Sequence, residues 1–243
     1  MTPADLRAQG HDAKAIAGFL GSEGVPSGGR VLDAPCGIGR RAIGLAAEGF
    51  HVTAVDSNEI GVDAARSRIP PDLRDRLRFL HAARESLPGL GEETFDAIVA
   101  LDHPIGRQGP GEDVAFLARL IPHIRGDGVL VLELLHRDFF ATRPDGFSFH
   151  VLADVEQHEF RSFDPVTGIL HLTWTFYHRE GEDLRHRGDA AARMRLPTPH
   201  EAASLLGSSG WRLAAAFGGW SREPVSANRR KVVLVARRVG STA

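Results

Sequence analysis

The sequence is poor in the features that mark secreted, membrane-spanning and nucleic-acid-binding proteins. Its 243 residues include a single cysteine, which excludes an internal disulfide and fits a reducing compartment. Lys14 and Lys231 are the only lysines, and a formal net charge of -2 gives no basic surface for nucleic acid. Apolar runs stay well below the roughly 18 residues of a membrane span, and the N-terminus lacks a signal-peptide pattern. We therefore expect a cytoplasmic protein with no nucleic-acid or membrane partner.

Up to about residue 136, short apolar segments alternate with amphipathic ones, which is typical of a parallel sheet with helical crossovers. Near the end of the chain, two further strands follow one another with no helix between them and are expected to pair antiparallel. The pattern predicts an α/β fold with a doubly wound, seven-stranded, mostly parallel sheet and an antiparallel final strand. The expected strands cover residues 30–34, 51–56, 77–82, 95–101, 128–135, 211–219 and 230–238, with helices at 39–48, 59–69, 112–124 and 198–210.

Residues 147–197 depart from this pattern, because polar and apolar residues alternate around a turn signal at 164–168. The alternation predicts an antiparallel β insert, which we place over the carboxyl edge of the main sheet. We divide the chain accordingly into a core at 1–140, a β-rich insert or lid at 141–197, and the rest of the core sheet at 198–243.

The turn after the first strand, "VLDAPCGIGR", fits two kinds of nucleotide site. Gly37, Gly39 and Ala42 satisfy the G-x-G-x-x-A pattern of dinucleotide binding. However, the carboxylate of Asp33 directly before this turn would repel a pyrophosphate, and Asp56 ends the next strand. Two acids at neighbouring strand ends favour a cationic ligand with a ribose diol and no phosphate, such as S-adenosylmethionine. NAD-dependent oxidation is the rival reading that this argument disfavours.

These segments resemble the class I S-adenosylmethionine-dependent methyltransferases. "VLDAPCGIGR" is similar to the family's glycine-rich first motif, with Pro35 where the common form has glycine, and "VTAVDSN" is similar to its second-strand motif. "FDAIVALDHPIG" and "LIPHIRGDGVLVLELLHRD" resemble the segments around the fourth and fifth strands, and the β insert resembles that of small-molecule methyltransferases. The resemblance implies S-adenosylmethionine as cofactor and S-adenosylhomocysteine as product.

The resemblance also implies roles for individual residues. Asp56 would bind the ribose hydroxyls, Asp33 would anchor the turn and the amino end, and backbone groups of the turn would hold the methionine portion. The family usually has an acid for adenine where this chain has Ala83, so the backbone of Arg84 is expected to take part instead. The expected cofactor-binding residues are Asp33, Ala34, Pro35, Gly37, Gly39, Asp56, Ser57, Ala83, Arg84 and Leu101.

Candidates for the chemistry come from the loops that follow the fourth and fifth strands. His103 and His136 are the candidate catalytic residues, because histidine is the natural general base near neutral pH. The chain has twelve histidines, so solvent-exposed or packing roles for both stay open. No metal-ligand spacing is present. The expected acceptor-binding residues are His103, Arg137, Trp174, Tyr177 and His178.

From these observations we expect an enzyme that transfers a methyl group from S-adenosylmethionine to a small organic acceptor by in-line displacement, with the accepting atom undetermined. The alternative left open is a protein of the same fold that binds S-adenosylmethionine without methylating, as a binding module or a cyclase-like catalyst. A homodimer through the β insert is the expected assembly.

Overall fold

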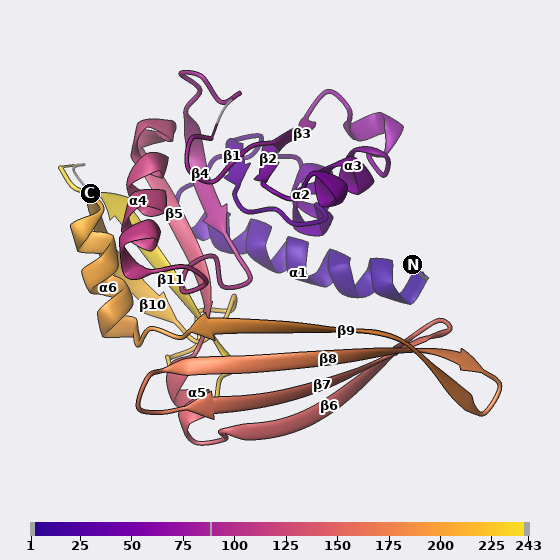
Figure 1. Cartoon of the computed structure of the whole chain (residues 1–243). Helices are drawn as coiled ribbons and strands as arrows, with labels where there is room; N and C mark the ends of the chain where they lie inside the picture. The colour runs from indigo at the N-terminus through magenta and orange to yellow at the C-terminus, as the bar shows by residue number, and fades with distance from the viewer. Residues whose placement is uncertain (1–2, 88, 241–243) are drawn as a thin grey trace.

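The computed structural model describes residues 3–87 and 89–240, and of residues 3–11 and 152 it describes the backbone alone. Seven strands form the main sheet in the order β10-β11-β5-β4-β1-β2-β3 (Figure 1). Only β11 runs antiparallel to its neighbours, so the predicted fold class is confirmed. The bounds of these strands are Arg30–Asp33 (β1), His51–Asp56 (β2), Leu77–His81 (β3), Phe95–Ala100 (β4), Ile124–Leu135 (β5), Trp211–Phe217 (β10) and Lys231–Arg238 (β11).

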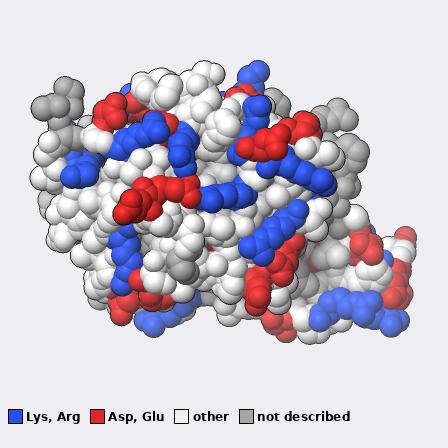
Figure 2. Space-filling model, turned by 90° about the horizontal axis from the view of Figure 1, so that it is seen from above, with Lys and Arg blue, Asp and Glu red and all other residues white. Residues whose placement is uncertain are grey.

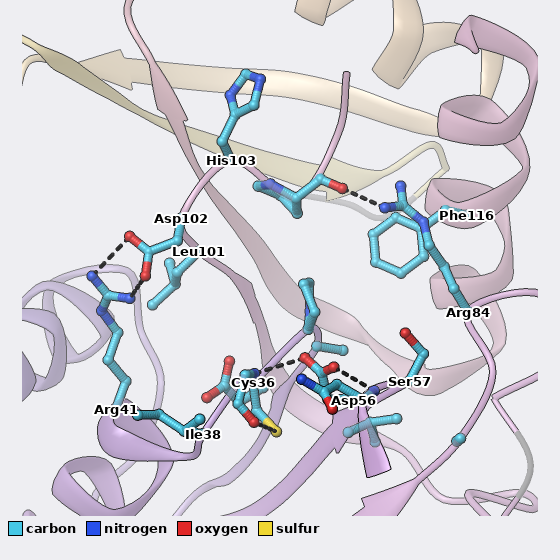
Figure 3. Close-up of a pocket in the computed structure, with 18 of the residues that line it drawn as sticks. Cys36, Ile38, Arg41, Asp56, Ser57, Arg84, Leu101, Asp102, His103 and Phe116 are labelled. Carbon is cyan, nitrogen blue, oxygen red and sulfur yellow. Dashed lines mark hydrogen bonds and ion pairs between the residues drawn. The ribbon is translucent and has the colours of Figure 1, made fainter. Parts of the chain in front are cut away.

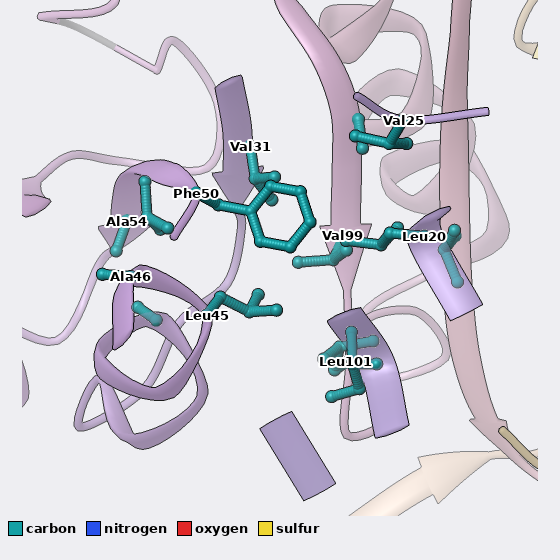
Figure 4. Close-up of a cluster of buried hydrophobic side chains, with 14 of the residues drawn as sticks. Leu20, Val25, Val31, Leu45, Ala46, Phe50, Ala54, Val99 and Leu101 are labelled. Carbon is teal, nitrogen blue, oxygen red and sulfur yellow. The ribbon is translucent and has the colours of Figure 1, made fainter. Parts of the chain in front are cut away.

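Helices cover both faces of this sheet, because successive strand residues point to opposite sides. Val31 packs in the cluster with α1 (Pro3–Ser22), α2 (Arg40–Ala47) and α3 (Glu59–Arg66), part of which is drawn in Figure 4. The next residue, Leu32, packs in the cluster with α4 (Pro110–Leu120) and α6 (Pro199–Ser208). The continuous apolar character of the central strands follows from this double coverage. None of the helices in the described part of the chain has the length and apolarity to cross a membrane.

Element ends differ from the sequence prediction at a few places. The helix expected at 59–69 begins after Asn58, whose side chain accepts a hydrogen bond from the backbone of Gly61, and ends at Arg66. The helix expected at 112–124 ends at Leu120 and continues as a 3-10 turn, Ile121–His123, that contains Pro122. A second 3-10 turn, Pro71–Leu73, precedes β3.

A second sheet of four antiparallel strands lies beside the main one (Figure 1). It comprises β6 (Asp145–Leu152), β7 (Val155–Asp164), β8 (Ile169–Glu180) and β9 (Asp183–Arg195), preceded by the short helix α5 (Arg137–Ala141), which the sequence pattern did not predict. An apolar cluster between α5 and the second sheet contains Phe140, Phe163, Leu170, Leu172, Met194 and Leu196, and the partly buried Leu135 of β5 packs against it. The near end of the second sheet is thereby held against the main sheet, beside the carboxyl ends of β4 and β5.

Charge is mixed on the surface. On the described residues of the face in Figure 2, basic and acidic side chains lie next to one another and do not separate into areas of one sign. This distribution agrees with the near-zero net charge of the sequence.

Candidate active site

Two acidic side chains mark the edge of the main sheet where β1 and β2 end. Asp33 is the last residue of β1, and Asp56 is the last residue of β2. The carboxylate of Asp56 accepts hydrogen bonds from the backbone N–H of Gly37 (2.7 Å) and of Asn58 (2.9 Å). One side chain thus fixes both the glycine-rich turn and the start of α3, and its own orientation is fixed in return (Figure 3).

The two glycines of the turn have different functions in the structure. Gly37 has a φ of 57° and open space where a side chain would begin. Glycine is therefore favoured here by the backbone conformation and not by a lack of space. Gly39 has a φ of 75°, and a Cβ there would lie 2.4 Å from the ring of Phe79 and 2.8 Å from Ala65. Gly39 therefore allows α2 to pack against β3 and α3, and it faces the core.

A cavity of about 560 Å³ opens in front of this turn. Its wall contains most of the expected cofactor-binding residues, namely Asp33, Ala34, Pro35, Gly37, Asp56, Ser57, Arg84 and Leu101, and also His103. Gly39 and Ala83, which were expected to bind the cofactor, are not in the wall. Wall residues that the sequence pattern did not single out include Ile38, Arg41, Leu87, Arg107 and Phe116.

One part of the cavity wall is flat and largely apolar. The guanidinium of Arg84 lies over the ring of Phe116, 3.9 Å from its centroid, and donates a hydrogen bond to the carbonyl of Pro104 at 2.5 Å (Figure 3). Asp113 accepts a longer hydrogen bond from the same guanidinium, at 3.4 Å. Such a paired aromatic ring and guanidinium plane presents a surface suited to a planar base. Phe116 comes from α4, and no local sequence signal placed it here.

Burial dominates the electrostatics of Asp33. The residue is 2% exposed, and burial raises its pKa to about 7, with the charge of Arg41 opposing this shift and those of Asp102 and Asp56 adding to it. A positive group entering the cavity beside this carboxyl would favour its ionised form. The cavity therefore has a site that gains a negative charge when a cation binds.

A network of four charged side chains closes one side of the cavity. Asp102 accepts hydrogen bonds from Arg41 and, at 3.3 Å, from Lys231, whose ammonium also lies 2.8 Å from Glu133. Although burial acts in the other direction, the hydrogen bond and charge of Arg41 together with Lys231 lower the pKa of Asp102 to about 2. Glu133 is 2% exposed, and its partners in this buried position are Lys231 and, at 3.7 Å, Arg41.

His103 lies at the cavity but is not available as a base. Its Nδ1 accepts a hydrogen bond from the backbone N–H of Leu135 (3.3 Å), so Nε2 carries the proton and donates to the carbonyl of Arg195 (3.0 Å). Burial lowers the pKa of His103 to about 4, which keeps the ring neutral. In Figure 3 the ring points away from Asp56 and the turn. His103 thus connects the loop after β4 to the end of β9.

His136 and Arg137 lie outside the walls of the cavities described here. The buried His136 ring has Nδ1 at 3.0 Å from the carbonyl of Ser226 and 3.2 Å from that of Arg229. Arg137 donates to the carbonyl of Pro165 at 2.9 Å. Both side chains hold neighbouring segments in place, and this geometry gives no support to the expected catalytic role of His136 or to acceptor binding by Arg137.

A second cavity, of about 240 Å³, lies between the main sheet and the second sheet. It shares Asp102, His103 and Arg107 with the first cavity, so the two adjoin. The rest of its wall consists of Glu133, Leu134, Leu135, Leu172, Trp174, Met194, Arg230 and Lys231. Trp174, expected to contact the acceptor, is therefore in place, with its indole N–H bonded to Glu159 at 2.8 Å.

Tyr177 and His178, the other expected acceptor contacts, lie farther along β8 and line neither cavity. The Tyr177 ring packs against His158, with 4.9 Å between centroids. His178 Nδ1 lies 3.1 Å from a carboxylate oxygen of Asp154, at the far end of the second sheet.

Two observations bear on alternative chemistry. Among the described residues, His, Cys, Asp and Glu side chains form no group of three or more that could hold a metal ion. Burial and the nearby charges of Asp33 and Asp56 raise the pKa of Cys36, so its thiol stays protonated and is a poor nucleophile.

Part of the chain matches a known family of protein domains. Residues 31–128 match the family described as "Methyltransferase domain". Magnesium-protoporphyrin O-methyltransferase from Rhodobacter capsulatus is 40% identical over 84 residues, which cover 35% of this chain and 36% of that protein. The chain thus matches about a third of the length of this curated relative.

Solved structures match over nearly the whole chain. The CcbJ methyltransferase from Streptomyces caelestis superimposes with a TM-score of 0.78 and 21% identity, covering 93% of this chain and 89% of that one. DesVI from Streptomyces venezuelae gives a TM-score of 0.76 at 19% identity and covers 98% and 99%. At this identity the likeness concerns the fold, and it includes the second sheet.

The first prediction tests the connecting role of His103. His103→Ala leaves the N–H of Leu135 and the carbonyl of Arg195 without partners at a buried site, so the free energy of unfolding should fall by about 1–3 kcal/mol. Urea denaturation measures this loss. The matched control is His150→Ala, because His150 is exposed and makes no interaction among the described residues. Equal stability of the two variants would contradict the connecting role.

The second prediction concerns Asp33. In the folded protein its carboxyl keeps its proton up to about pH 7, whereas in the unfolded chain it loses the proton above about pH 4. The folded state therefore binds more protons between these values, and its stability should fall as pH rises from about 4 to 7 and level off above. Asp33→Asn should remove this contribution. In denaturation experiments the variant should therefore gain more free energy of unfolding relative to the wild type at pH 8 than at pH 5. Exposed Asp75→Asn is the control; identical pH profiles for Asp33→Asn and the wild type would refute the buried carboxyl.

Proposed function

Since the chain carries a methyltransferase domain of the class I S-adenosylmethionine-dependent type, we propose that it transfers a methyl group from S-adenosylmethionine to a small organic acceptor by in-line displacement. The observation that carries the proposal is the pair of acids at adjacent strand ends, Asp33 and Asp56, in the wall of one cavity. A phosphate-bearing cofactor would be repelled there, whereas a cationic cofactor with a ribose diol would be bound.

The residues of the cavity fit such a cofactor. Each oxygen of Asp56 accepts one backbone hydrogen bond and keeps a lone pair for a ribose hydroxyl. Asp33 would face the amino group, and the flat surface of Arg84 and Phe116 would take the adenine. When bound, S-adenosylmethionine would supply a methyl group made electrophilic by its sulfonium. The roles of Ala34, Pro35, Gly37, Ser57 and Leu101 would be to shape the cavity around it.

We assign the rate acceleration to placement and exclusion of water, which suit a displacement at carbon. His103 is the only histidine among the described residues that line these cavities, and both its ring nitrogens are engaged. Its proposed role is to position the loop between the two cavities. The network of Arg41, Asp102, Lys231 and Glu133 would hold the same loop from the other side.

The second cavity is the proposed acceptor site, with Trp174 in its wall. On this view residues 1–140 hold the cofactor, residues 141–197 cover the acceptor, and residues 198–243 complete the main sheet. The single cysteine supports a reducing location such as the cytoplasm. We propose no nucleic-acid partner, in keeping with the mixed surface charge.

The third prediction tests the cofactor. Asp56→Ala should weaken binding of S-adenosylmethionine by about 2 kcal/mol, roughly thirtyfold, because the diol loses a charged partner and the turn loses its tie to α3. Isothermal titration with S-adenosylmethionine, S-adenosylhomocysteine and NAD measures this, and thermal melting checks that the variant folds. Exposed Asp63→Ala on α3 should bind like the wild type.

Three outcomes would count against the proposed function. Unchanged affinity in Asp56→Ala would refute the site, and tight NAD binding without response to the other two ligands would indicate an oxidoreductase. Binding of S-adenosylmethionine with no S-adenosylhomocysteine formed across a broad panel of small acceptors would favour the alternative, a protein that binds the cofactor without methylating.

We propose in addition that two copies of the chain pair through the outer face of the second sheet. Phe147, Phe149 and Phe160 are 53%, 58% and 52% exposed there, and their rings lie against one another and His158. An exposed aromatic patch of this kind on an antiparallel sheet suits a twofold interface.

The fourth prediction follows from this face. The wild type should elute as a dimer in size-exclusion chromatography with light scattering, and Phe147→Ser/Phe160→Ser should elute as a monomer with unchanged cofactor binding. Val166→Ser, at the 92% exposed tip of the β7–β8 hairpin, is the control for loss of a surface apolar residue. A wild type that is monomeric at micromolar concentration would overturn the dimer.

A further inference from the structure

Arg107 lies where the two cavities adjoin. It lines both of them, it is exposed, and it makes no hydrogen bond or ion pair with any described residue. The loop that carries it is held just before the residue, by His103 to the carbonyl of Arg195 at 3.0 Å and by the backbone N–H of Gly106 to Asp113 at 2.8 Å. Its guanidinium, with all its donors free, borders both cavities at the place where the two ligands would meet.

The acidic side chains of the second cavity already have partners. Asp102 is bound by Arg41 and Lys231, and Glu133 is bound by Lys231. Arg230 lies 3.5 Å from Glu159, just outside the wall. The charge left without a partner is therefore positive, and Arg107 carries it.

The surroundings of Arg107 add to this positive charge. Arg84 and Arg195 both lie near one buried acid, Asp113, at 3.4 and 4.0 Å. His103 contributes no negative group, and its ring stays neutral. A cationic acceptor would have to displace Lys231 from Asp102 and Glu133, whereas an anionic acceptor would meet an open guanidinium.

The opposite wall of the second cavity is apolar. Leu172, Trp174 and Met194 of the second sheet face Leu134 and Leu135 of β5 across it. The Trp174 indole is held by its bond to Glu159, so the apolar wall has a defined shape. A ligand that suits both features has an apolar body and an anionic end.

Building on the proposed function, we infer that the methyl acceptor is a small organic carboxylate, with its apolar body against Trp174 and its carboxylate bound by Arg107. A carboxylate matches the two parallel donors of one guanidinium. A doubly charged phosphate would be repelled more strongly by the neighbouring carboxylates of Asp102 and Glu133. Arg107 is then a residue that determines specificity, and it takes no part in the displacement.

The probes that test this inference are benzoate, its neutral analogue benzamide and its cationic analogue benzylamine. Each is titrated into the full chain, with and without S-adenosylhomocysteine, while the indole N–H signal of Trp174 is followed by two-dimensional NMR. The chain has three tryptophans, so Trp174→Phe identifies the signal. Benzoate should shift it in a saturable way, and should bind at least tenfold more tightly than either analogue.

Variants locate the anion site. Arg107→Gln should weaken benzoate at least tenfold and leave benzamide unchanged, and Arg107→Lys should retain part of the benzoate affinity. Arg187→Gln is the matched control, because Arg187 is an exposed arginine of β9 that lines no cavity described here and makes no interaction among the described residues. Affinity for S-adenosylhomocysteine is measured in the same proteins and should be unchanged in Arg187→Gln.

Each contrary result has a definite meaning. Equal binding of benzoate and benzamide, or full benzoate affinity in Arg107→Gln, overturns the anionic acceptor. Preference for benzylamine reverses the sign and indicates an amine. Failure of all three probes to shift Trp174 at their solubility limits removes the second cavity as an acceptor site. Failure of S-adenosylhomocysteine to bind would instead count against the proposed function. The benzoate titrations made without S-adenosylhomocysteine would still test whether Arg107 binds an anion.

Discussion

The carboxylate of Asp56 is the constraint on which the cofactor site depends. It accepts the backbone N–H groups of Gly37 and Asn58, and so brings the ends of β1 and β2 and the start of α3 into one fixed arrangement. The turn can pass so close to α3 only because Gly39 has no side chain in front of Phe79 and Ala65. These few contacts set the shape of the larger cavity on the side of the turn.

The sequence was most informative where function and local structure use the same residues. Asp33 and Asp56 could be identified because each ends an apolar strand, and parallel strands bring such ends to one edge. The main sheet followed from the alternation of apolar and amphipathic segments. The second sheet was visible as a change of period, but that pattern did not give all four strands or the helix α5.

The remainder of the site depends on contacts between segments that are far apart in the chain. His103 looked like a base because it follows a strand at the right edge. Its partners are the backbone of Leu135 and of Arg195, which no pattern of side chains reveals. Phe116 and Arg84, and likewise Lys231 and Asp102, meet only once the sheet has formed. For His136, position at a strand end was misleading, because its ring is turned into the segment at 226–230.

The scarcity of lysine has a practical consequence at the network beside the cavity. Lys231 is one of two lysines in the chain, its side chain is 38% exposed, and it joins Asp102 to Glu133. Reagents that acylate primary amines, as in surface immobilisation or fluorescent labelling with active esters, have few other targets on this protein. Such treatment would concentrate its effect at the boundary between the two cavities and remove the counter-charge of a buried glutamate. Attachment through an engineered tag, or through thiol chemistry at an introduced surface cysteine, keeps that boundary intact.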